Sequence, residues 1–255
     1  MTLRALSLFS GIGGIDLGLA PYARTVCYVE NNPYCVDVLR ARQRDGRLHT
    51  APIWDDVTTF DGNPWRGSVD LIHGGFPCQD ISAAGKGAGI TGQRSGLWSE
   101  FARIIREVRP RFVFVENVAM LLVRGIDTVL GDLAESGYDA RWLRLSAADV
   151  GAPHRRQRIF ILANHSSQQV GAPRFTRETD GSHQTMANAE RVRELQPQGC
   201  ESNERRRAGN GDWWSVEPDV GRVAHAVPRR VHRLKALGNA VVPAQARKAW
   251  EILTA

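Results

Sequence analysis

The chain has 255 residues, of which 42% are hydrophobic and 24% are charged, and this balance excludes an intrinsically disordered chain and a coiled coil. No apolar run approaches the roughly 18–20 residues that a helix needs to span a bilayer. The formal net charge is +6 and the basic residues are almost all arginine, which permits a polyanionic partner, although a GC-rich coding sequence would explain most of the arginines equally well.

The N-terminal residues lack the layout of a signal peptide and lead directly into a predicted strand at Ala5–Phe9. We therefore expect a cytoplasmic protein whose cysteines are free thiols. The cysteines show neither the spacing of a zinc site nor the density of a disulfide framework, so no metal ion is expected. They are Cys27, Cys35, Cys78 and Cys200.

The first two-thirds of the chain alternates short β-branched or aromatic runs with helical patterns, which predicts a doubly wound α/β fold with a mostly parallel sheet. The predicted strands are Ala5–Phe9, Thr25–Glu30, Val69–His73, Arg111–Glu116, Ala140–Leu145 and Arg158–Leu162. The predicted helices are Gly14–Ala20, Pro33–Arg42, Leu97–Val108 and Ile126–Ser136, followed much later by a terminal amphipathic helix at Ala244–Leu253.

A glycine-rich turn, Ser10-Gly11-Ile12-Gly13-Gly14, joins the first predicted strand to the first predicted helix. Such a turn lets a ligand approach the backbone closely, and a helix N-terminus favours anionic groups. The spacing differs from the GxGxxG fingerprint, so a pyrophosphate ligand is not favoured. A turn with a purely structural role is the alternative.

Carboxylates follow at the next two predicted strand ends. The second strand ends in Glu30-Asn31, where an acidic side chain can hold ribose hydroxyls. Asp55-Asp56-Val57 marks another strand end. For Glu30 or Asp56 taken singly, a helix cap or a solvated loop carboxylate is an equally good interpretation.

One cysteine lies in a loop shaped by glycine and proline, just past the third predicted strand. The stretch is Gly74-Gly75-Phe76-Pro77-Cys78-Gln79-Asp80-Ile81-Ser82. Loops of this kind position nucleophiles on a rigid scaffold. Cys27 and Cys35 instead lie within strand and helix patterns, where buried inert thiols are expected.

Four motifs then identify a resemblance to the cytosine-5 DNA methyltransferase family. In chain order they are Phe9–Gly14, Gly75-Phe76-Pro77-Cys78-Gln79, Val115-Glu116-Asn117-Val118 and Gly238-Asn239-Ala240-Val241-Val242-Pro243. The resemblance covers nearly everything except Asn164–Arg233. It implies an S-adenosylmethionine (AdoMet)-dependent enzyme that methylates carbon 5 of a cytosine flipped out of duplex DNA.

The resemblance also assigns catalytic roles. Cys78 would add as a thiolate to C6 of the cytosine, and the activated ring would then take the methyl group at C5. Glu116 would bind N3 and the exocyclic amine, and Arg158 would contact O2 and support the thiolate. Arg156 would be its structural or catalytic neighbour. The family usually has glutamine where this chain has His154, and no role follows for that histidine.

The resemblance places AdoMet in the N-terminal half. Phe9 would pack against it, the Ser10–Gly14 backbone would cradle its methionine part, Glu30 would hold the ribose, and Asp56 and Val57 would bind the adenine. Because Asn239 belongs to the same pocket, the C-terminal segment must close back on the N-terminal part. The full set is Phe9, Ser10, Gly11, Ile12, Gly13, Gly14, Glu30, Asn31, Asp56, Val57, Pro77, Leu97 and Asn239.

The polar stretch from Asn164 to Arg233 departs from the family pattern. The family's Arg-Glu-Cys-type motif is not found, and 222–237 occupies its place, as in a compact member of phage or prophage type. We expect a catalytic domain at 1–163, completed by 234–255, and a small loop-rich target-recognition insert at 164–233. A solvated linker is the alternative for the insert.

Within the insert, several arginines are candidates for contacts with bases and phosphates, and Trp213-Trp214 should anchor it on the catalytic domain. These arginines are Arg177, Arg191, Arg193 and Arg205–Arg207. The Gly85–Arg94 loop would be a flap over the flipped base, or an ordinary surface loop.

The sequence therefore predicts a monomeric DNA cytosine-5 methyltransferase, with duplex DNA as partner and a cognate restriction endonuclease as a further candidate. Three alternatives stay open. One is an RNA (tRNA) cytosine-5 methyltransferase, one is a catalytically inactive module that binds AdoMet and DNA, and one is an unrelated α/β protein with a buried cysteine.

Overall fold

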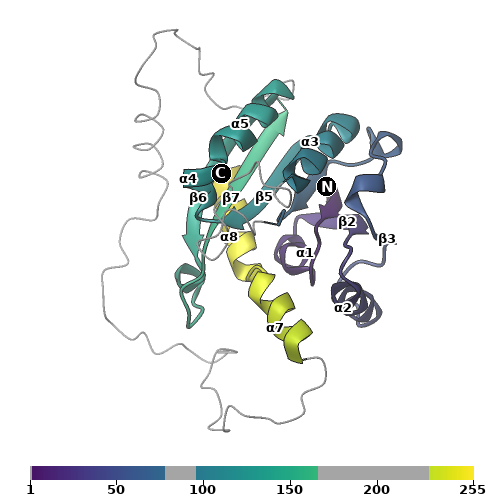
Figure 1. Ribbon diagram of the computed structural model, residues 1–255, viewed down its shortest axis with the longest axis vertical. Helices are drawn as coiled ribbons and strands as arrows, with labels where there is room; N and C mark the ends of the chain where they lie inside the picture. Colours follow the sequence, from purple (N-terminus) through teal and green to yellow (C-terminus); the bar gives the residue numbers. More distant parts are fainter. Residues whose placement is uncertain (1, 78–95, 166–229) are drawn as a thin grey trace.

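A computed structural model of the protein describes residues 2–77, 96–165 and 230–255. Its centre is a seven-stranded sheet with the order β3-β2-β1-β4-β5-β7-β6 (Figure 1). The strands are β1 (Leu3–Leu8), β2 (Ala23–Val29), β3 (Ile53–Trp54), β4 (Leu71–Gly74), β5 (Phe112–Val118), β6 (Tyr138–Ser146) and β7 (Gln157–His165).

The direction of winding reverses between β1 and β4. From β1 the chain moves outward through β2 and β3, and it then returns to place β4 and β5 on the other side of β1. These five strands pair in parallel, whereas β7 pairs antiparallel with both β5 and β6. Ligands of doubly wound sheets bind beyond the carboxyl ends of the strands at such a reversal. The topology alone therefore indicates where to look for a site.

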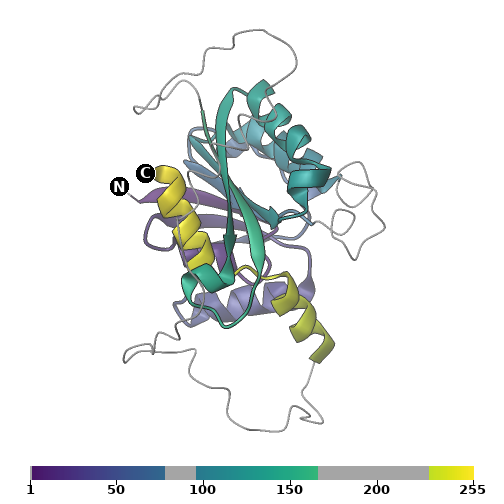
Figure 2. The same cartoon turned by 90° about the vertical axis from the view of Figure 1, so that its left-hand side faces the viewer.

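Helices cover both faces of the sheet, because successive side chains of each buried strand point to opposite faces. The strand core residues Ala5, Leu71 and Phe114 pack with one helix layer, and their neighbours Leu6 and Ile72 pack with the other. The first layer contains α1 (Gly14–Leu19) and α8 (Pro243–Thr254), and the second contains α3 (Leu97–Val108) and α5 (Ile126–Glu135). Figure 2 shows α8 in yellow on one side of the strands and the teal helices on the other.

The remaining helices lie near the ends of the strands. They are α2 (Pro33–Arg44), the short α4 (Leu121–Arg124) and α7 (Arg230–Asn239). Helix α7 lies beside α2 (Figure 1), where Ala236 packs against Ile12 and Cys35. No helix in the described part of the chain combines the length and apolarity needed to cross a membrane.

A buried polar cluster fixes the start of α1 on the sheet. Asp16 accepts hydrogen bonds from the Ser7 hydroxyl of β1 at 3.1 Å and from the Thr25 hydroxyl of β2 at 2.8 Å. His73 of β4 lies 3.5 Å from the same carboxylate. Burial lowers the pKa of His73 more than Asp16 raises it, so the imidazole is neutral. Hydrogen bonds from β1 and β2 thus hold the helix that follows the glycine turn.

The C-terminal segment is locked onto α1 by close backbone contact. A Cβ atom on Gly18 would lie 2.5 Å from the carbonyl oxygen of Pro243, so only glycine allows α8 to approach this closely. Arg247 donates a hydrogen bond to the Gly18 carbonyl at 3.3 Å. The fully buried Gln245 donates to the carbonyl oxygens of Leu145 and Arg156, at 2.7 and 2.8 Å.

The predicted fold class, α/β with a mostly parallel sheet, is confirmed. Each predicted strand has an observed counterpart, and α3 has the predicted bounds. The strand end predicted at Asp55 is that of β3, which stops at Trp54. Two α-helices were not predicted: α4, which is too short to show a period, and α7. The large apolar residues of α7, Val231, Leu234 and Leu237, are exposed, so this helix does not bury an apolar face as the predicted helices do.

Candidate active site

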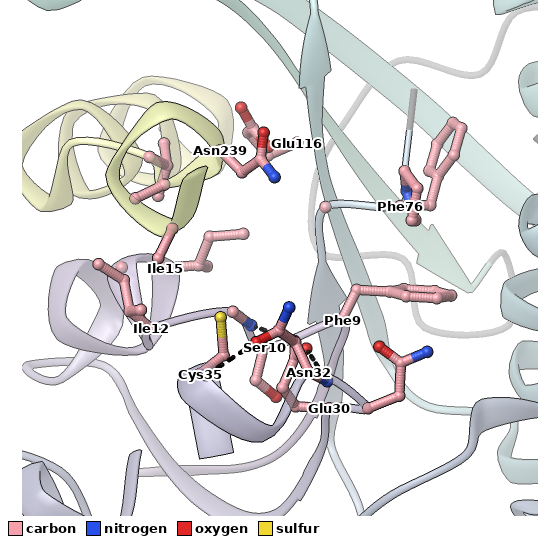
Figure 3. Close-up of a pocket in the computed structure, with 18 of the residues that line it drawn as sticks. Phe9, Ser10, Ile12, Ile15, Glu30, Asn32, Cys35, Phe76, Glu116 and Asn239 are labelled. Atoms are coloured by element: carbon pink, nitrogen blue, oxygen red, sulfur yellow. Dashed lines mark hydrogen bonds between the residues drawn. The ribbon is translucent and has the colours of Figure 1, made fainter. Parts of the chain in front are cut away.

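A cavity of about 580 Å³ opens beyond the carboxyl ends of β1, β2, β4 and β5. This volume lies within the usual range of small-molecule pockets. The segments that follow these strands supply most of its wall, and α3 and α7 supply the rest. Figure 3 shows Phe9 and Phe76 on one side of the cavity, Ile12 and Cys35 opposite, and Glu116 and Asn239 at its upper end.

The glycine turn after β1 forms the floor of this cavity. Phe9, Gly11 and Gly13 all have positive φ angles, of 50°, 54° and 79°, so the chain reverses tightly and turns its backbone toward the cavity. The Ser10 amide donates to the carbonyl of Val29 at 3.1 Å, which joins the turn to the end of β2. The Arg42 guanidinium of α2 donates to the Ile12 carbonyl and holds the turn from behind.

Glu30 connects the turn to the next segment of the wall. One carboxylate oxygen accepts the Gly11 amide at 2.7 Å, and the other accepts the Asn32 amide at 2.8 Å. Burial raises the pKa of Glu30, and these backbone bonds act in the opposite direction. A carboxylate has more acceptor sites than these backbone bonds occupy, so the predicted ribose-binding residue also builds the floor.

Asn32 begins α2 and lines the cavity next to Glu30. Its side-chain oxygen accepts the amides of Tyr34 and Cys35, at 3.0 and 3.3 Å. The Cys35 thiol also lines the cavity, and burial raises its pKa to about 11, so it is a thiol at neutral pH. Asn32 was not predicted as a site residue, although an asparagine directly before Pro33 is a strong helix-cap signal.

Asp56 and Val57 form the far wall. One Asp56 oxygen accepts the Thr58 amide at 2.9 Å and the Thr58 hydroxyl at 2.8 Å, and these bonds lower the pKa of Asp56. The carboxylate is therefore ionised and caps the short 3-10 helix η1 (Val57–Thr59). Arg103 donates to the Val57 carbonyl at 3.0 Å and fixes this corner.

A buried ion pair lies at the upper end of the cavity. Arg158 of β7 places its Nε atom 2.7 Å from a carboxylate oxygen of Glu116 on β5. Val118 of β5 lies directly opposite Arg158 in the antiparallel register. Glu116, two residues before Val118, therefore lies on the same face of the sheet as Arg158 and diagonally across from it. Burial raises the pKa of Glu116, while Arg158 and Arg156 lower it. Glu116 is thus a carboxyl group that can hold a proton nearer to neutral pH than an exposed glutamate does.

Arg156, two residues before Arg158, lies outside the cavity lining. Its guanidinium donates to the carbonyl oxygen of Gly238 at 2.6 Å. The structure therefore places this arginine behind the Gly238-Asn239 segment, from where its charge still lowers the pKa of Glu116. His154 is exposed and likewise outside the lining.

The structure brings together every described member of the predicted set except Gly13 and Arg156. Gly13 belongs to the turn but packs against Leu48, where a Cβ atom on Gly13 would lie 2.7 Å from a methyl group of that leucine. Cys78, the Gly85–Arg94 loop and the assigned insert residues lie outside the described residues, but Pro77, directly before Cys78, lines the cavity. The predicted residues that line the cavity are Phe9, Ser10, Gly11, Ile12, Gly14, Glu30, Asn31, Asp56, Val57, Pro77, Leu97, Glu116, Arg158 and Asn239.

Helix α7 supplies wall residues that were not predicted from the sequence. Alongside the predicted Asn239, it contributes His232, Lys235 and Ala236. Their spacing of three or four residues is typical of one helix face, and this is the signal that could have found them. The described part of the chain contains no cluster of three or more side chains suited to a metal ion.

Comparisons with known proteins agree with this geometry. A family model described as "C-5 cytosine-specific DNA methylase" matches residues 3–231. The type II methyltransferase M.CviJI of Paramecium bursaria Chlorella virus IL3A is 37% identical over 164 residues, which cover 64% of this chain and 43% of the viral protein. The type II methyltransferase M.AquIA of Picosynechococcus sp. is 32% identical over 198 residues, which cover 69% of this chain and 77% of that protein.

Among solved structures, the Dnmt2 methyltransferase of S. pombe superposes with a TM-score of 0.53. The match covers 67% of this chain and 52% of the yeast protein, at 22% identity, and supports the fold alone. This chain therefore spans about half the length of several proteins that it matches.

Proposed function

The chain belongs to the C-5 cytosine-specific DNA methylase family, and on that premise we propose that it transfers a methyl group from AdoMet to carbon 5 of a cytosine in duplex DNA. The observation that carries the proposal is the buried Glu116–Arg158 pair, 2.7 Å apart, at one end of the cavity that Pro77 also lines. A carboxyl group with a raised pKa beside an arginine suits a neutral heterocycle that must be polarised during the reaction.

The lining of the cavity fits AdoMet. The backbone of the glycine turn can approach the ligand closely, and Glu30 and Asp56 offer carboxylate oxygens to ribose hydroxyls and to an adenine amine. Phe9, Val57 and Leu97 offer apolar surface to the adenine ring. When bound, AdoMet supplies a methyl group on a sulfonium, ready for transfer to a carbon nucleophile.

The proposed roles of the protein residues follow from the weak nucleophilicity of C5 in cytosine. The Cys78 thiolate forms a bond to C6, and Glu116 shares its proton with N3, which takes up the displaced electron density. C5 then carries the electron pair that attacks the methyl carbon, while the bond from that carbon to the AdoMet sulfur breaks and the neutral thioether leaves. Loss of the C5 proton to a base restores the C5–C6 double bond and releases the thiolate. Arg158 contacts the O2 atom of the ring and keeps Glu116 in place.

The domain boundaries form part of the proposal. Residues 1–163 and 234–255 make up the catalytic unit, and residues 164–233 recognise the target sequence. The packing of α8 on α1 supports the first half of this statement, since Gly18 and Pro243 lie in direct contact. The observed elements extend slightly beyond these limits, to His165 at the end of β7 and from Arg230 at the start of α7.

The test is covalent trapping on DNA. Bisulfite sequencing of host DNA after expression first identifies the methylated site. A duplex with 5-fluorocytosine at that site should then form a denaturation-resistant complex, because fluorine cannot leave as a proton does. Cys78→Ala should abolish the complex, and Cys200→Ala, which removes another thiol, should not. A complex that survives Cys78→Ala would disprove the nucleophile, and trapping on an RNA substrate alone would favour the tRNA alternative.

A further inference from the structure

One face of α7 forms part of the cavity wall. His232, Lys235, Ala236 and Asn239 all line the cavity, and their spacing places them on one side of the helix. Val231, Leu234 and Leu237 of the same helix are exposed. The side chain of Lys235 therefore belongs to the cavity face of α7 even though much of it is accessible to solvent.

Contacts on either side of Lys235 hold this face in position. Ala236 is buried against Ile12 of the glycine turn and Cys35 of α2. The His232 ring stacks on Tyr34, with ring centroids 6.0 Å apart and an interplanar angle of 24°. The backbone that carries Lys235 is thus tied to α2 and to the glycine turn, the two elements that form the floor of the cavity.

Lys235 differs from the other strongly basic residue of the cavity in its ionic contacts. Arg158, the other strongly basic lining residue, is paired with Glu116, whereas Lys235 forms no salt bridge with any residue in the described part of the chain. Its charge nevertheless reaches the cavity, because it lowers the pKa of the Cys35 thiol against the larger effect of burial. Among the described residues, Lys235 is therefore a cation without an ionic partner near Cys35 and Ile12.

AdoMet has one anionic group, the carboxylate of its methionine half, beside a cationic ammonium and a cationic sulfonium. The carboxylates Glu30 and Asp56 suit the hydroxyls and the amine at the other half of the molecule. We infer that Lys235 binds the AdoMet carboxylate through its ammonium group, as an ion pair from α7 across the glycine turn. This inference rests on the proposed function, since it assumes that AdoMet occupies the cavity.

Removal of the carboxylate from the ligand provides the sharpest test. Calorimetric titration would compare AdoMet with decarboxylated AdoMet, on the wild type and on Lys235→Met, without any methyl transfer. The wild type should bind AdoMet about two- to fivefold more tightly than the decarboxylated ligand, the upper part of the range for an exposed ion pair. Lys235→Met should lose this preference and bind AdoMet more weakly by the same factor, while its affinity for decarboxylated AdoMet stays at the wild-type value.

Two further variants separate charge from packing. Lys235→Arg should keep the preference for the carboxylate, because it keeps the charge. Lys248→Met removes a lysine of α8 that lies 4.0 Å from Glu251, and it should bind both ligands as the wild type does.

Equal weakening of both ligands by Lys235→Met would overturn the inference and assign the residue to the packing of α7. Unchanged affinity for AdoMet would overturn it as well. A wild type that binds neither ligand would instead contradict the proposed function, and the inference would fall with it.

Discussion

Glu30 does two things with one carboxylate, because it accepts amides from Gly11 and Asn32 while facing the cavity. Glu30→Ala should therefore weaken AdoMet binding by about 2–3 kcal/mol, the upper part of the range for hydrogen bonds to charged groups. The Asp56 side chain only caps the short η1 helix, so Asp56→Ala should weaken AdoMet binding by about tenfold or less. Calorimetric titration would measure both effects, with DNA affinity nearly unchanged. Unchanged AdoMet affinity in both variants would contradict the pocket.

Alanine substitutions at Arg156 and Arg158 should affect different kinetic constants, although the two residues are only two positions apart. Arg156 supports the Gly238 carbonyl at 2.6 Å, so Arg156→Ala should raise the KM for AdoMet several-fold through Asn239 and change kcat little. Arg158→Ala removes the partner of Glu116 and should lower kcat by about a hundredfold or more. Steady-state rates at varied AdoMet concentration would measure the split. A large loss of kcat in Arg156→Ala, with an unchanged KM for AdoMet, would indicate instead that Arg156 contacts the target cytosine.

At this scale the position of Glu30 after a strand end predicted a ligand contact, because a doubly wound sheet binds ligands at such ends, whereas Phe9 and Glu116 were predicted through the resemblance of their motifs. It could not predict the role of Arg156, whose contact with Gly238 joins positions 82 residues apart. Lys235 was missed for a different reason: no helix was predicted over α7, so the helix face that its spacing from His232 and Asn239 indicates was not recognised.

The junction of α1 and α8 tests the architecture at the scale of elements. A Cβ atom on Gly18 would lie 2.5 Å from the Pro243 carbonyl. Gly18→Ala should therefore separate the two helices and lower the free energy of unfolding by about 1–3 kcal/mol. Gly131→Ala in α5 is the matched control, because nothing lies within 4 Å of its added methyl group, and it should raise stability by about 0.5–1 kcal/mol. Urea unfolding would measure both. Equal stability of the two variants would contradict the close approach.

Elements with a full period were predictable, and α3 was predicted with its observed bounds because Trp98, Phe101 and Ile105 mark one buried helix face. Parallel and antiparallel pairing could not be told apart from the apolar runs of β6 and β7. Their direction depends on the connection between them, and a tight connection through the 3-10 helix η4 (Ala147–Val150) turns the chain back on itself.

At the scale of the whole molecule, residues 164–233 should determine which DNA sequence is methylated. Most of this stretch lies outside the described residues, so the prediction rests on composition. Arg205–Arg207 changed together to alanine should weaken DNA binding and flatten its salt dependence, by about one unit of log–log slope for each phosphate that the protein no longer neutralises. The same positions changed to lysine should keep the slope.

Exchange of the whole 164–233 stretch with that of a similarly short relative should then move the methylated site in a bisulfite map. A hybrid that methylates efficiently at the original site would place recognition elsewhere, most plainly in the Gly85–Arg94 loop.

The contact between α8 and α1 joins positions 229 residues apart, as the bond from Arg247 to Gly18 shows. On a ribosome, a chain that has not yet released residues 235–247 presents the glycine turn and the open side of α1, but not the opposite wall of the cavity. Completion of the pocket therefore waits until α7 and α8 have emerged. The same separation slows refolding of a denatured chain, because the loop between the two partners must close before their contact stabilises anything.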